Sequence, residues 1–306
     1  MNVAIITGYL GQDGKYLSKF LHRKKYTVDG YKINVLDKKK LYKLLLKYKD
    51  FENIEIYNLA AKVNTGLKVN NTIETFHVNS IGILTILEVI KELKLSDKCK
   101  IFQASSSETI HNPDTIYSIS KISADLIVKM YRNVHGFHIS SGVLFSHESP
   151  YKSEKFVTPK IINGLKKVMI GEIEHVEVGN IDTYKDWGHA EDYVEAMWLI
   201  LQDKEPGDYV VSTGQKHTIR EMIELTLKIM GKQITWEGEN VNEVGIVDNK
   251  IVIKVSNKFY IPCKKESGLN EFDAFKRVNN WKPKYNLTTM TSIMLEKLKE
   301  KYNKTD

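Results

Sequence analysis

The sequence predicts an α/β fold, with a doubly wound parallel sheet and a smaller α/β domain beside it in the chain. Over the first two-thirds of the 306 residues, short apolar segments alternate with amphipathic segments of helix length, which is the pattern of parallel βαβ units. A glycine-rich turn joins the first apolar segment to the first amphipathic one. Segment 232–262 mixes Gly, Asn and short β-like runs, which is typical of a small accessory region.

The hydrophobic periodicity assigns the individual elements. The expected strands are Val3–Thr7, Thr27–Lys32, Ile54–Leu59, Lys100–Ala104, Ile139–Phe145, Val176–Val178 and Tyr209–Ser212. The expected helices are Lys15–Arg23, Lys38–Tyr48, Ile73–Leu93, Ile116–His135, Phe156–Met169, Ala190–Gln202, Ile219–Met230 and Met290–Tyr302. The predicted first domain comprises 1–150 and about 186–214, and the second comprises about 151–185 and 215–306.

The second strand predicts a shortened sheet. Thr27–Lys32 is followed almost at once by a helix, where a doubly wound dinucleotide-binding fold normally has a further helix and strand. We therefore expect the sheet to be one strand short on this side, with 27–32 at its edge.

Composition narrows the class of protein. Hydrophobic residues make up 42% and charged residues 27%, and no segment approaches the ~20 apolar residues of a membrane span. We expect no membrane association and, since Met1 leads straight into a strand, no signal peptide. Cys99 and Cys263 are far apart and lack metal-ligand spacing. We expect free thiols, a reducing cytoplasmic compartment and no metal site.

The net charge of +7 and the pI of about 9.0 raise the question of nucleic acid. The lysines are scattered, without a basic stripe interleaved with aromatic residues. The lysine run 38–40 begins a predicted helix, and such a run usually forms a solvent-exposed face. We therefore expect no nucleic-acid partner. A basic excess also suits an anionic substrate such as a sugar nucleotide.

The glycine-rich turn predicts a dinucleotide site. It is Thr7-Gly8-Tyr9-Leu10-Gly11-Gln12-Asp13-Gly14, placed between a strand and a helix. Glycine lets the backbone turn tightly and approach a pyrophosphate at the helix N-terminus. An ordinary tight turn is the alternative, but the position near the start of the chain favours cofactor binding.

A serine, a tyrosine and a lysine predict the chemistry. Ser105-Ser106-Ser107-Glu108 follows a strand, at the carboxyl edge where such sheets bind ligands. Tyr117 and Lys121 are four residues apart and therefore share a helix face. The lysine charge, with that of an oxidised nicotinamide, lowers the tyrosine pKa from ~10 so that Tyr117 can take a proton from a sugar hydroxyl. A serine hydroxyl orients that oxygen; a solvated helix face is the alternative.

Further runs carry a resemblance to a known family. They are Tyr57-Asn58-Leu59-Ala60-Ala61, Phe102-Gln103-Ala104-Ser105-Ser106-Ser107-Glu108, His147-Glu148-Ser149-Pro150, Phe156-Val157-Thr158, Gly179-Asn180-Ile181-Asp182, 186–198 and Asn280-Trp281-Lys282-Pro283. With the turn 7–14 they resemble the GDP-mannose 4,6-dehydratases, which belong to the extended short-chain dehydrogenase/reductase superfamily. The resemblance covers nearly the whole chain and implies a Rossmann-type fold.

The resemblance implies a lyase that converts GDP-mannose, or a close GDP-sugar, to the GDP-4-keto-6-deoxy sugar. Tyr117 would deprotonate the 4-hydroxyl as hydride leaves C4, Glu108 would remove the C5 proton as water leaves C6, and hydride would return to C6. Glu108 distinguishes dehydration from oxidation or epimerisation, because elimination needs a second acid/base group. Ser106 aligns with the hydroxyl-bearing residue that lies near this glutamate in the family. A surface carboxylate or helix cap is the alternative for Glu108.

The resemblance also implies the binding residues. The cofactor set is Gly8, Leu10, Gly11, Gln12, Asp13, Asn34, Val35, Leu59, Ala60, Ala61, Tyr117, Lys121, Leu144 and His147. The substrate set is Ser106, Glu108, Tyr117, Val157, Lys160, Asn180 and Lys185. For His147 and Asn180 a loop-stabilising hydrogen bond is the alternative. The family implies NADP, with NAD left open.

The chain departs from the family pattern in its loops and arginines. The arginine-rich loop after strand two, which binds the NADP 2′-phosphate and helps assemble a tetramer, is missing, and Lys32 is the cation nearby. A loop between Glu108 and the tyrosine segment is also shortened. Positions that are arginine in the family differ here: they are Tyr151-Lys152, Pro159, Lys185 and Ile261. Lysine keeps the positive charge but cannot form the bidentate hydrogen bonds of arginine. We expect a homodimer through a helix pair.

Three functions remain after these observations. The first is a GDP-mannose 4,6-dehydratase or a close variant. The second is a reductase or epimerase that keeps only the Ser–Tyr–Lys chemistry, against which Glu108 argues. The third is a catalytically silent binding protein, favoured by the deletions and lost arginines and disfavoured by the intact Ser106, Glu108, Tyr117 and Lys121.

Overall fold

The computed structural model describes residues 2–30, 32–63, 71–111, 113–261 and 275–302. The chain forms two compact units. The first comprises Met1–Phe145, Ala190–Val211 and Ser267–Lys282, and the second comprises Ser146–His189, Ser212–Glu266 and Pro283–Asp306.

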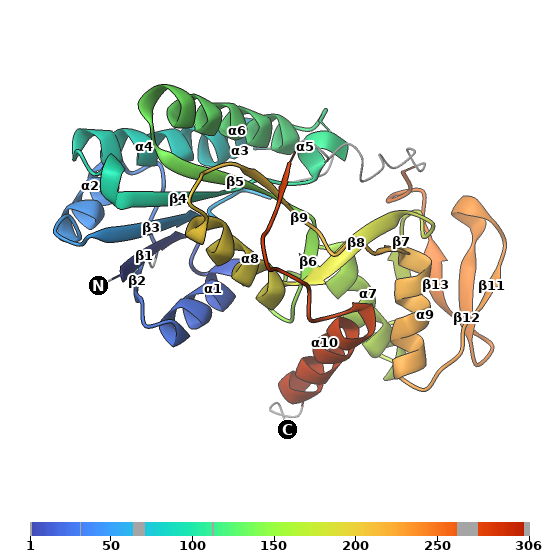
Figure 1. Cartoon of the computed structure of the whole chain (residues 1–306). Coiled ribbons are helices and arrows are strands. Elements are labelled where there is room, and N and C mark those ends of the chain that lie inside the picture. Colours follow the sequence, from blue (N-terminus) through green and yellow to red (C-terminus); the bar gives the residue numbers. More distant parts are fainter. Residues whose placement is uncertain (1, 31, 64–70, 112, 262–274, 303–306) are drawn as a thin grey trace. The chain divides into compact units, whose positions relative to one another are not determined.

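The first unit is built on a seven-stranded sheet in the order β14-β9-β5-β4-β3-β1-β2 (Figure 1). Every neighbouring pair is parallel. The strands are β1 (Asn2–Thr7), β2 (Thr27–Asp29), β3 (Asn53–Asn58), β4 (Cys99–Ala104), β5 (His138–Leu144), β9 (Asp208–Val211) and β14 (Lys276–Arg277). Because β2 pairs only with β1, the expected short sheet with strand two at its edge is confirmed.

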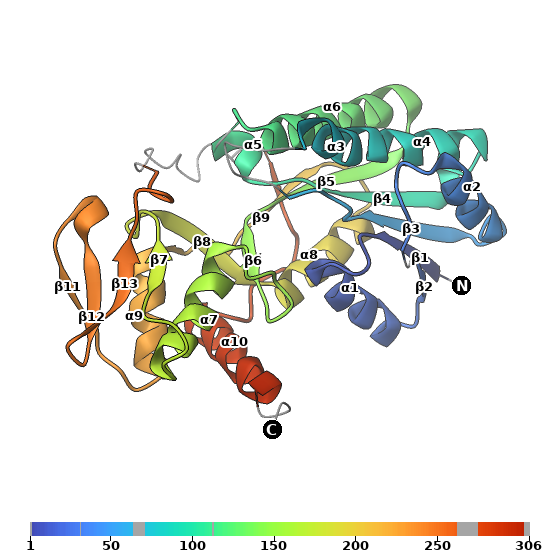
Figure 2. The ribbon, with the colours of Figure 1, turned by 180° about the vertical axis from the view of Figure 1, so that it is seen from behind.

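Helices cover both faces of this sheet (Figures 1 and 2). On one face, α1 (Gln12–Arg23) and α8 (Ala190–Gln202) bury Leu17, Leu21 and Met197 in one core cluster. On the other, α2 (Lys38–Lys47), α4 (Gly82–Glu92) and α6 (Ile116–His135) bury a second cluster that includes Leu41 and Val128. Apolar residues of the strands point alternately to the two faces of the sheet and so belong to both clusters, as a doubly wound sheet requires.

Several predicted elements have different bounds in the structure, among them strand two and the helix expected over 73–93. Strand two ends at Asp29 rather than Lys32, because Gly30 (φ 115°) and Lys32 (φ 57°) leave the extended conformation. The helix expected over 73–93 is divided into α3 (Thr72–Phe76), the π-helical turn η1 (His77–Ile81) and α4. Such a turn inside a helix often marks a functional position.

The segment Thr72–Glu92 is, among the described residues, the one helix long and apolar enough to cross a membrane. Half of its most apolar window is buried within the protein. Ile83, Leu87 and Ile90 belong to the core under α2 and α6. The apolar composition of this segment is therefore that of a helix packed in the protein core.

In its described residues, the second unit contains two small sheets and three α-helices. The sheets have the orders β10-β8-β6 and β11-β12-β13-β7. Their strands are β6 (Ser146–Glu148), β7 (Val176–Val178), β8 (Tyr184–His189), β10 (Lys216–Thr218), β11 (Thr235–Glu237), β12 (Val244–Val247) and β13 (Lys250–Val255). The helices α7 (Val157–Met169), α9 (Ile219–Ile229) and α10 (Leu287–Tyr302) share one apolar core with them.

The unit boundaries differ from the predicted domain boundaries at four places, since residues 146–150 and 212–214 also belong to the second unit. Residues 186–189 belong to the second unit, because β8 pairs with β6 and β10. The described part of 267–282 returns to the first unit, where β14 pairs with β9. A two-residue strand carries no periodic signal, so the sequence placed all of 215–306 in one domain.

Candidate active site

The glycine turn packs closely against the protein's own backbone. A Cβ on Gly8 would lie 2.8 Å from the amide nitrogen of Ala60, and one on Gly14 would lie 2.5 Å from the carbonyl oxygen of Tyr9. Gly8 also has φ +70°, where side chains other than glycine are strained. The turn therefore packs directly on 59–60, at the end of β3. Two groups of predicted cofactor residues, the turn and Leu59–Ala60, lie together.

A ladder of buried amide and hydroxyl groups follows the carboxyl edge of the sheet. Thr7 Oγ1 donates to Asn58 Oδ1 (2.6 Å), and Asn58 Nδ2 donates to Gln103 Oε1 (2.7 Å). Gln103 Nε2 donates in turn to the carbonyl oxygen of Ala104 (3.0 Å). These bonds fix the ends of β1, β3 and β4 relative to one another. The last acceptor, the carbonyl oxygen of Ala104, also accepts a hydrogen bond from Lys121 on α6.

Tyr117 and Lys121 lie buried on the first turns of α6. Thr115 caps the helix by accepting the amide of Ser118 (3.1 Å), which fixes where the helix begins. Tyr117 is 7% and Lys121 2% exposed. Lys121 Nζ donates to the Ala104 carbonyl (2.7 Å) and lies 5.9 Å from the centroid of the Tyr117 ring. A solvated helix face, the alternative interpretation of this pair, is wrong.

Ser106 and Glu108 lie on the β4-to-α6 connection. Ser106 hydrogen-bonds the Tyr117 side chain and its Oγ accepts the amide of Glu108 (3.3 Å). Glu108 begins the short helix α5 (Glu108–His111) and is half-buried. The carboxylate acts electrostatically on Tyr117. The structure therefore gathers all four predicted catalytic residues, Ser106, Glu108, Tyr117 and Lys121, at one end of β4.

Burial dominates the electrostatics of this group. Desolvation raises the pKa of Tyr117 to about 12, against the hydrogen bond from Ser106, and the nearby Glu108 and Asp13 raise the pKa further. Desolvation also lowers the pKa of Lys121 to about 8. Perturbations of this kind are characteristic of active sites. The phenol needs added positive charge before it can give up its proton near neutral pH.

Asn79, which the sequence analysis missed, holds α6 in place from the π-helical turn. Asn79 Nδ2 donates to Ser120 Oγ (2.9 Å), which donates to the carbonyl of Tyr117 (2.7 Å). Asn79 Oδ1 also accepts the amide of Lys62 (2.8 Å). The π-helical turn places this amide, and a plain helical pattern over 73–93 gave no signal for it.

The remaining cofactor candidates of the first unit have different surroundings. Leu10 is half exposed on the glycine turn, and Gln12 and Asp13 open α1. Asn34 is exposed and accepts the amide of Leu36 (3.0 Å). The Val35 side chain is buried in the core against Gly82, so only its backbone is available to a ligand. Gly11 is exposed, Ala61 is half-buried, and Leu144 ends β5.

The candidates of the second unit lie on β6 and β8, on α7 and in the loop that follows β7. His147 is in β6, and its carbonyl accepts Lys152 Nζ (2.9 Å). Asn180 accepts the amide of Asp182 (3.0 Å) and donates to the carbonyl of Ile261 (3.4 Å), which is the loop-stabilising role weighed for it. Lys185 is half-buried in β8. Val157 begins α7.

Lys160 lines a cavity within the second unit. The cavity has a volume of about 330 Å³, and its lining includes Lys160, Glu177 and Phe259. Lys160 Nζ lies 3.8 Å from the centroid of the Phe259 ring. Burial lowers the Lys160 pKa, and Glu177 opposes this effect. The ring, the ammonium and the carboxylate offer a planar surface and two kinds of polar partner.

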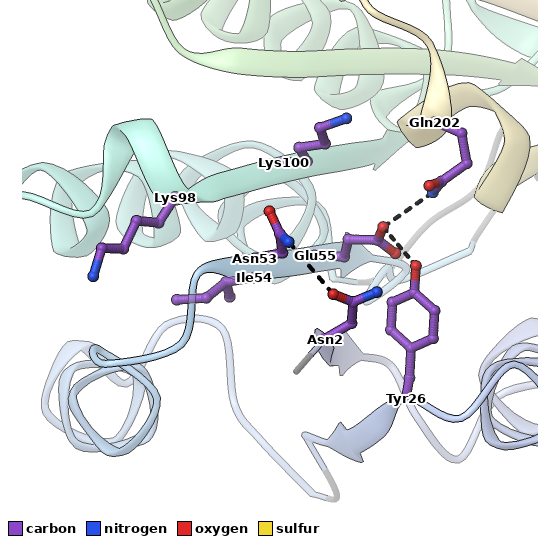
Figure 3. Close-up of a pocket in the computed structure, with 8 residues that line it drawn as sticks. All are labelled: Asn2, Tyr26, Asn53, Ile54, Glu55, Lys98, Lys100 and Gln202. Atoms are coloured by element: carbon purple, nitrogen blue, oxygen red, sulfur yellow. Dashed lines mark hydrogen bonds between the residues drawn. The ribbon is translucent and has the colours of Figure 1, made fainter.

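The opposite, amino edge of the sheet holds a smaller polar cavity of about 170 Å³ (Figure 3). Glu55 Oε1 accepts Tyr26 Oη (2.9 Å) and Gln202 Nε2 (3.0 Å), and Oε2 accepts Tyr57 Oη (2.7 Å). Lys100 donates to the carbonyl of Leu201 (3.0 Å). The carboxylate is fully used by structural partners, so we assign this cavity no chemistry.

Metal chemistry would need a cluster of ligating side chains. Among the residues that the structure describes, no group of three His, Cys, Asp or Glu side chains could hold a metal ion. Cys99 is a buried free thiol, and Cys263 lies outside the described residues. The glycine turn, the parallel sheet and the Ser106–Tyr117–Lys121 group define a dehydrogenase/reductase-type site of the short-chain class.

Comparison with known proteins places the chain more narrowly. The family described as GDP-mannose 4,6 dehydratase matches residues 31–294. GDP-mannose 4,6 dehydratase of Homo sapiens is 36% identical over 92% of this chain and 87% of that protein. The Drosophila melanogaster enzyme of the same name is 35% identical over 96% and 85%. The chain belongs to the GDP-mannose 4,6-dehydratase family.

Solved structures confirm the fold. RMD from Pseudomonas aeruginosa, complexed with NADPH, superposes with a TM-score of 0.78 at 20% identity, covering 98% of this chain and all of that one. dTDP-glucose 4,6-dehydratase from Bacillus anthracis, in complex with NAD, gives a TM-score of 0.72 at 19% identity, covering 99% and 98%. The predicted Rossmann-type fold and the predicted family are both confirmed.

Proposed function

We propose that this protein is a GDP-mannose 4,6-dehydratase, a hydro-lyase that forms the GDP-4-keto-6-deoxy sugar by internal redox chemistry. The observation that carries the proposal is the convergence of Glu108 and Ser106 on the buried pair Tyr117 and Lys121. Oxidation alone needs one proton acceptor, whereas elimination of water from the oxidised sugar needs a second acid/base group.

The first unit fits a dinucleotide. Gly8 and Gly14 leave no room for side chains, and the amino end of α1 follows directly, where backbone amides favour a pyrophosphate. Gly8, Gly11, Gln12 and Asp13 would hold the phosphates, and Leu59, Ala60 and Ala61 would border the ring system. When bound, a nicotinamide cofactor supplies the acceptor and donor of hydride and, in its oxidised form, a positive charge.

The protein's own groups then divide the proton transfers. Tyr117 takes the proton of the sugar 4-hydroxyl, and Ser106 orients that oxygen by hydrogen bonding. Lys121 stabilises the phenolate by its charge. The 4-ketone makes the C5 proton acidic, and Glu108 removes it and returns a proton to the departing 6-hydroxyl, which leaves as water.

Mass spectrometry tests the reaction. The purified protein, incubated with GDP-mannose and NADP⁺ or NAD⁺, should give a product lighter by the mass of one water. A product that has lost only two hydrogens, or that has unchanged mass, would identify the reductase or epimerase alternative. Binding without turnover would identify a silent homologue.

Replacing Glu108 by Gln isolates the second proton transfer. The dehydration rate should fall by roughly 10²–10⁴ because the amide cannot take the C5 proton. Exchange of the C5 hydrogen with solvent deuterium, followed by mass spectrometry, should fall in parallel. An undiminished rate would remove Glu108 from the mechanism.

We also propose NADP as the cofactor. The family membership supports it, and the related RMD was solved with NADPH. Lys32, exposed directly after β2, is the cation in the region that follows strand two. Competitive binding of NADP⁺ and NAD⁺ tests the choice, with Lys32→Ala expected to weaken NADP⁺ alone.

The nucleotide part of the substrate is proposed to bind the second unit. Val157, Asn180 and Lys185 are candidates there, and the Lys160 cavity provides an aromatic ring and a cation for a base or phosphate. Lys160→Ala should raise KM for GDP-mannose by about tenfold or more, the equivalent of one lost charge-assisted contact. An unchanged KM would remove this residue from the substrate site.

We propose a homodimer formed by a helix pair. Apolar side chains are exposed along one face of α6 and on the adjoining α3 and η1: Ile119, Leu126, Met130, Val134, Ile73 and Ile81. Their spacing on α6 follows the helical repeat, and a self-complementary patch is what a twofold dimer requires. Leu126→Lys should give a monomer in sedimentation, and Leu46→Lys on α2 should not. A tetramer in the unmodified protein would contradict the proposal.

A cytoplasmic location is proposed from the cysteines. Cys99 is buried and unpaired, as is usual in a reducing compartment. Fractionation of the source cells with an antibody against the chain tests it.

A further inference from the structure

A second carboxylate, the half-buried Asp125, lies on the same helix as the catalytic pair. Asp125 follows Lys121 by one helical turn on α6, so both side chains point from the same face. Ser105 Oγ donates to Asp125 Oδ2 (2.6 Å), and Ser141 Oγ donates to Asp125 Oδ1. The carboxylate thus joins α6 to Ser105, just after β4, and to β5, directly beside catalytic Ser106.

Lys121 depends on its surroundings to stay charged. The ammonium is buried, and its hydrogen bond goes to the carbonyl oxygen of Ala104 rather than to a carboxylate. A carbonyl dipole alone does not offset the cost of burying an ammonium. Asp125 is the charge that opposes the effect of burial on the lysine. It is therefore the group able to keep Lys121 protonated.

The two serines favour the ionised form of Asp125. A carboxylate is an acceptor only, and each of its oxygens here accepts one hydroxyl. The Asp125 pKa lies above its ordinary value because of burial, and both hydroxyls and Lys121 oppose this rise. Such hydrogen bonds to the charged form are the means by which a buried acid remains ionised.

We propose that Asp125 is a positioning residue that keeps Lys121 protonated, and so sustains the phenolate of Tyr117 during the reaction. The proposal rests on the dehydratase function proposed above. Asp125 does not touch the substrate; it acts through Lys121. Ser105 and Ser141 hold it in place from β4 and β5, and neither has a role in the proton transfers themselves.

The other charges around this group are accounted for. Asp208 on β9 acts on Asp125 and is itself paired with Arg132 (2.7 Å) and Lys129 (3.5 Å). Glu108 on α5 and Asp13 on α1 act on Tyr117. Asp125 is the one described carboxylate that acts on Lys121.

Asp125→Asn removes the charge and keeps the shape and one acceptor oxygen. Because activity requires protonated Lys121, the rate of GDP-mannose dehydration should fall as pH rises through the lysine pKa. In Asp125→Asn this alkaline limb should move to lower pH by about one unit. Glu55→Gln is the matched control, since it removes another buried, hydrogen-bonded carboxylate of the same sheet. Its limb should stay in place.

A direct titration separates this proposal from the proposed function. In protein labelled with [ε-¹³C]lysine, the resonance missing from Lys121→Arg belongs to Lys121, and its midpoint is measured in each variant. The midpoint should fall by about one unit in Asp125→Asn. This readout needs no turnover, so an inactive unmodified protein would overturn the dehydratase function and leave the lysine measurement decisive.

A further variant covers a failure of Asp125→Asn to fold. Ser141→Ala keeps the charge and removes one hydroxyl donor, so the Lys121 midpoint should move in the same direction by a smaller amount. An unchanged midpoint in every folded variant overturns the proposal. So does an equal shift in Glu55→Gln, because loss of any buried carboxylate would then be enough.

Discussion

The two edges of the seven-stranded sheet each hold a hydrogen-bonded carboxylate, and the surroundings of the two carboxylates differ. At the amino edge Glu55 accepts hydrogen bonds from the neutral side chains of Tyr26 and Gln202 (Figure 3). Its other carboxylate oxygen accepts the hydroxyl of Tyr57. At the carboxyl edge Asp125 takes two serine hydroxyls and lies one turn from a buried ammonium. The surroundings of Glu55 satisfy the hydrogen bonding of its carboxylate with neutral groups. The surroundings of Asp125 place its carboxylate near a buried ammonium, and its charge opposes the lowering of the Lys121 pKa by burial.

The difference teaches that burial by itself does not make a site. Both carboxylates meet the requirement that buried polar groups be hydrogen-bonded. Burial also raises the Tyr26 pKa at the amino edge to about 12, so a displaced pKa does not make a site either. The carboxyl edge adds a buried lysine, whose pKa is lowered to about 8 by burial against the opposing charge of Asp125. It also adds the glycine turn, packed against the end of β3. In a doubly wound sheet this is also the edge at which crossover connections open.

The largest effect is expected at Tyr117. Tyr117→Phe removes the phenolic proton acceptor, and kcat for GDP-mannose dehydration should fall by about 10⁴. The melting temperature should change little, because the ring is retained. A variant with substantial activity would break the comparison, since the carboxyl edge would then have no special chemistry.

The next effect is expected at the glycine turn. Gly8→Ala places a Cβ against the backbone of Leu59 and Ala60 at a φ that alanine avoids. Affinity for the nicotinamide cofactor, measured by fluorescence titration, should fall at least about tenfold, the equivalent of ~1.4 kcal/mol. Gly136→Ala is a matched control, because it has a similar φ and no neighbour within 4 Å; it should bind cofactor normally.

A smaller effect, on stability alone, is expected at the amino edge. Glu55→Gln leaves two tyrosine hydroxyls competing for one amide oxygen, and the free energy of unfolding should fall by about 1–3 kcal/mol in urea denaturation. With GDP-mannose, kcat should remain within a factor of about two, well inside the change expected from one unit of pKa. A large loss of kcat in a folded variant would show that the two edges are coupled.

The smallest effect sharpens the role of the π-helical turn. Asn79→Ser shortens the side chain that joins Ser120 to Lys62. The loss of about one buried hydrogen bond, roughly 1 kcal/mol, should lower kcat several-fold by loosening α6. KM for GDP-mannose should change less than kcat, and an unchanged kcat would limit Asn79 to a structural role.

Local sequence signals gave much of the fold and the chemical centre. The alternation of strands and helices predicted the order of the main elements and the edge position of β2. The spacing of Tyr117 and Lys121 placed them on one helix face, and the serine run placed Ser106 and Glu108 at the end of β4. These signals are periodic or adjacent in the chain, so a single segment is enough to show them.

Tertiary structure decided what no single segment contains. The strands β6, β10 and β14 are short, and they and the longer β8 pair with partners distant in sequence. Asp125 looked like any polar residue of a helix until β4 and β5 brought Ser105 and Ser141 to it. The sequence alone determined which groups could react. Folding determined their charges, because a pKa depends on burial and on neighbours that only the packed chain assembles.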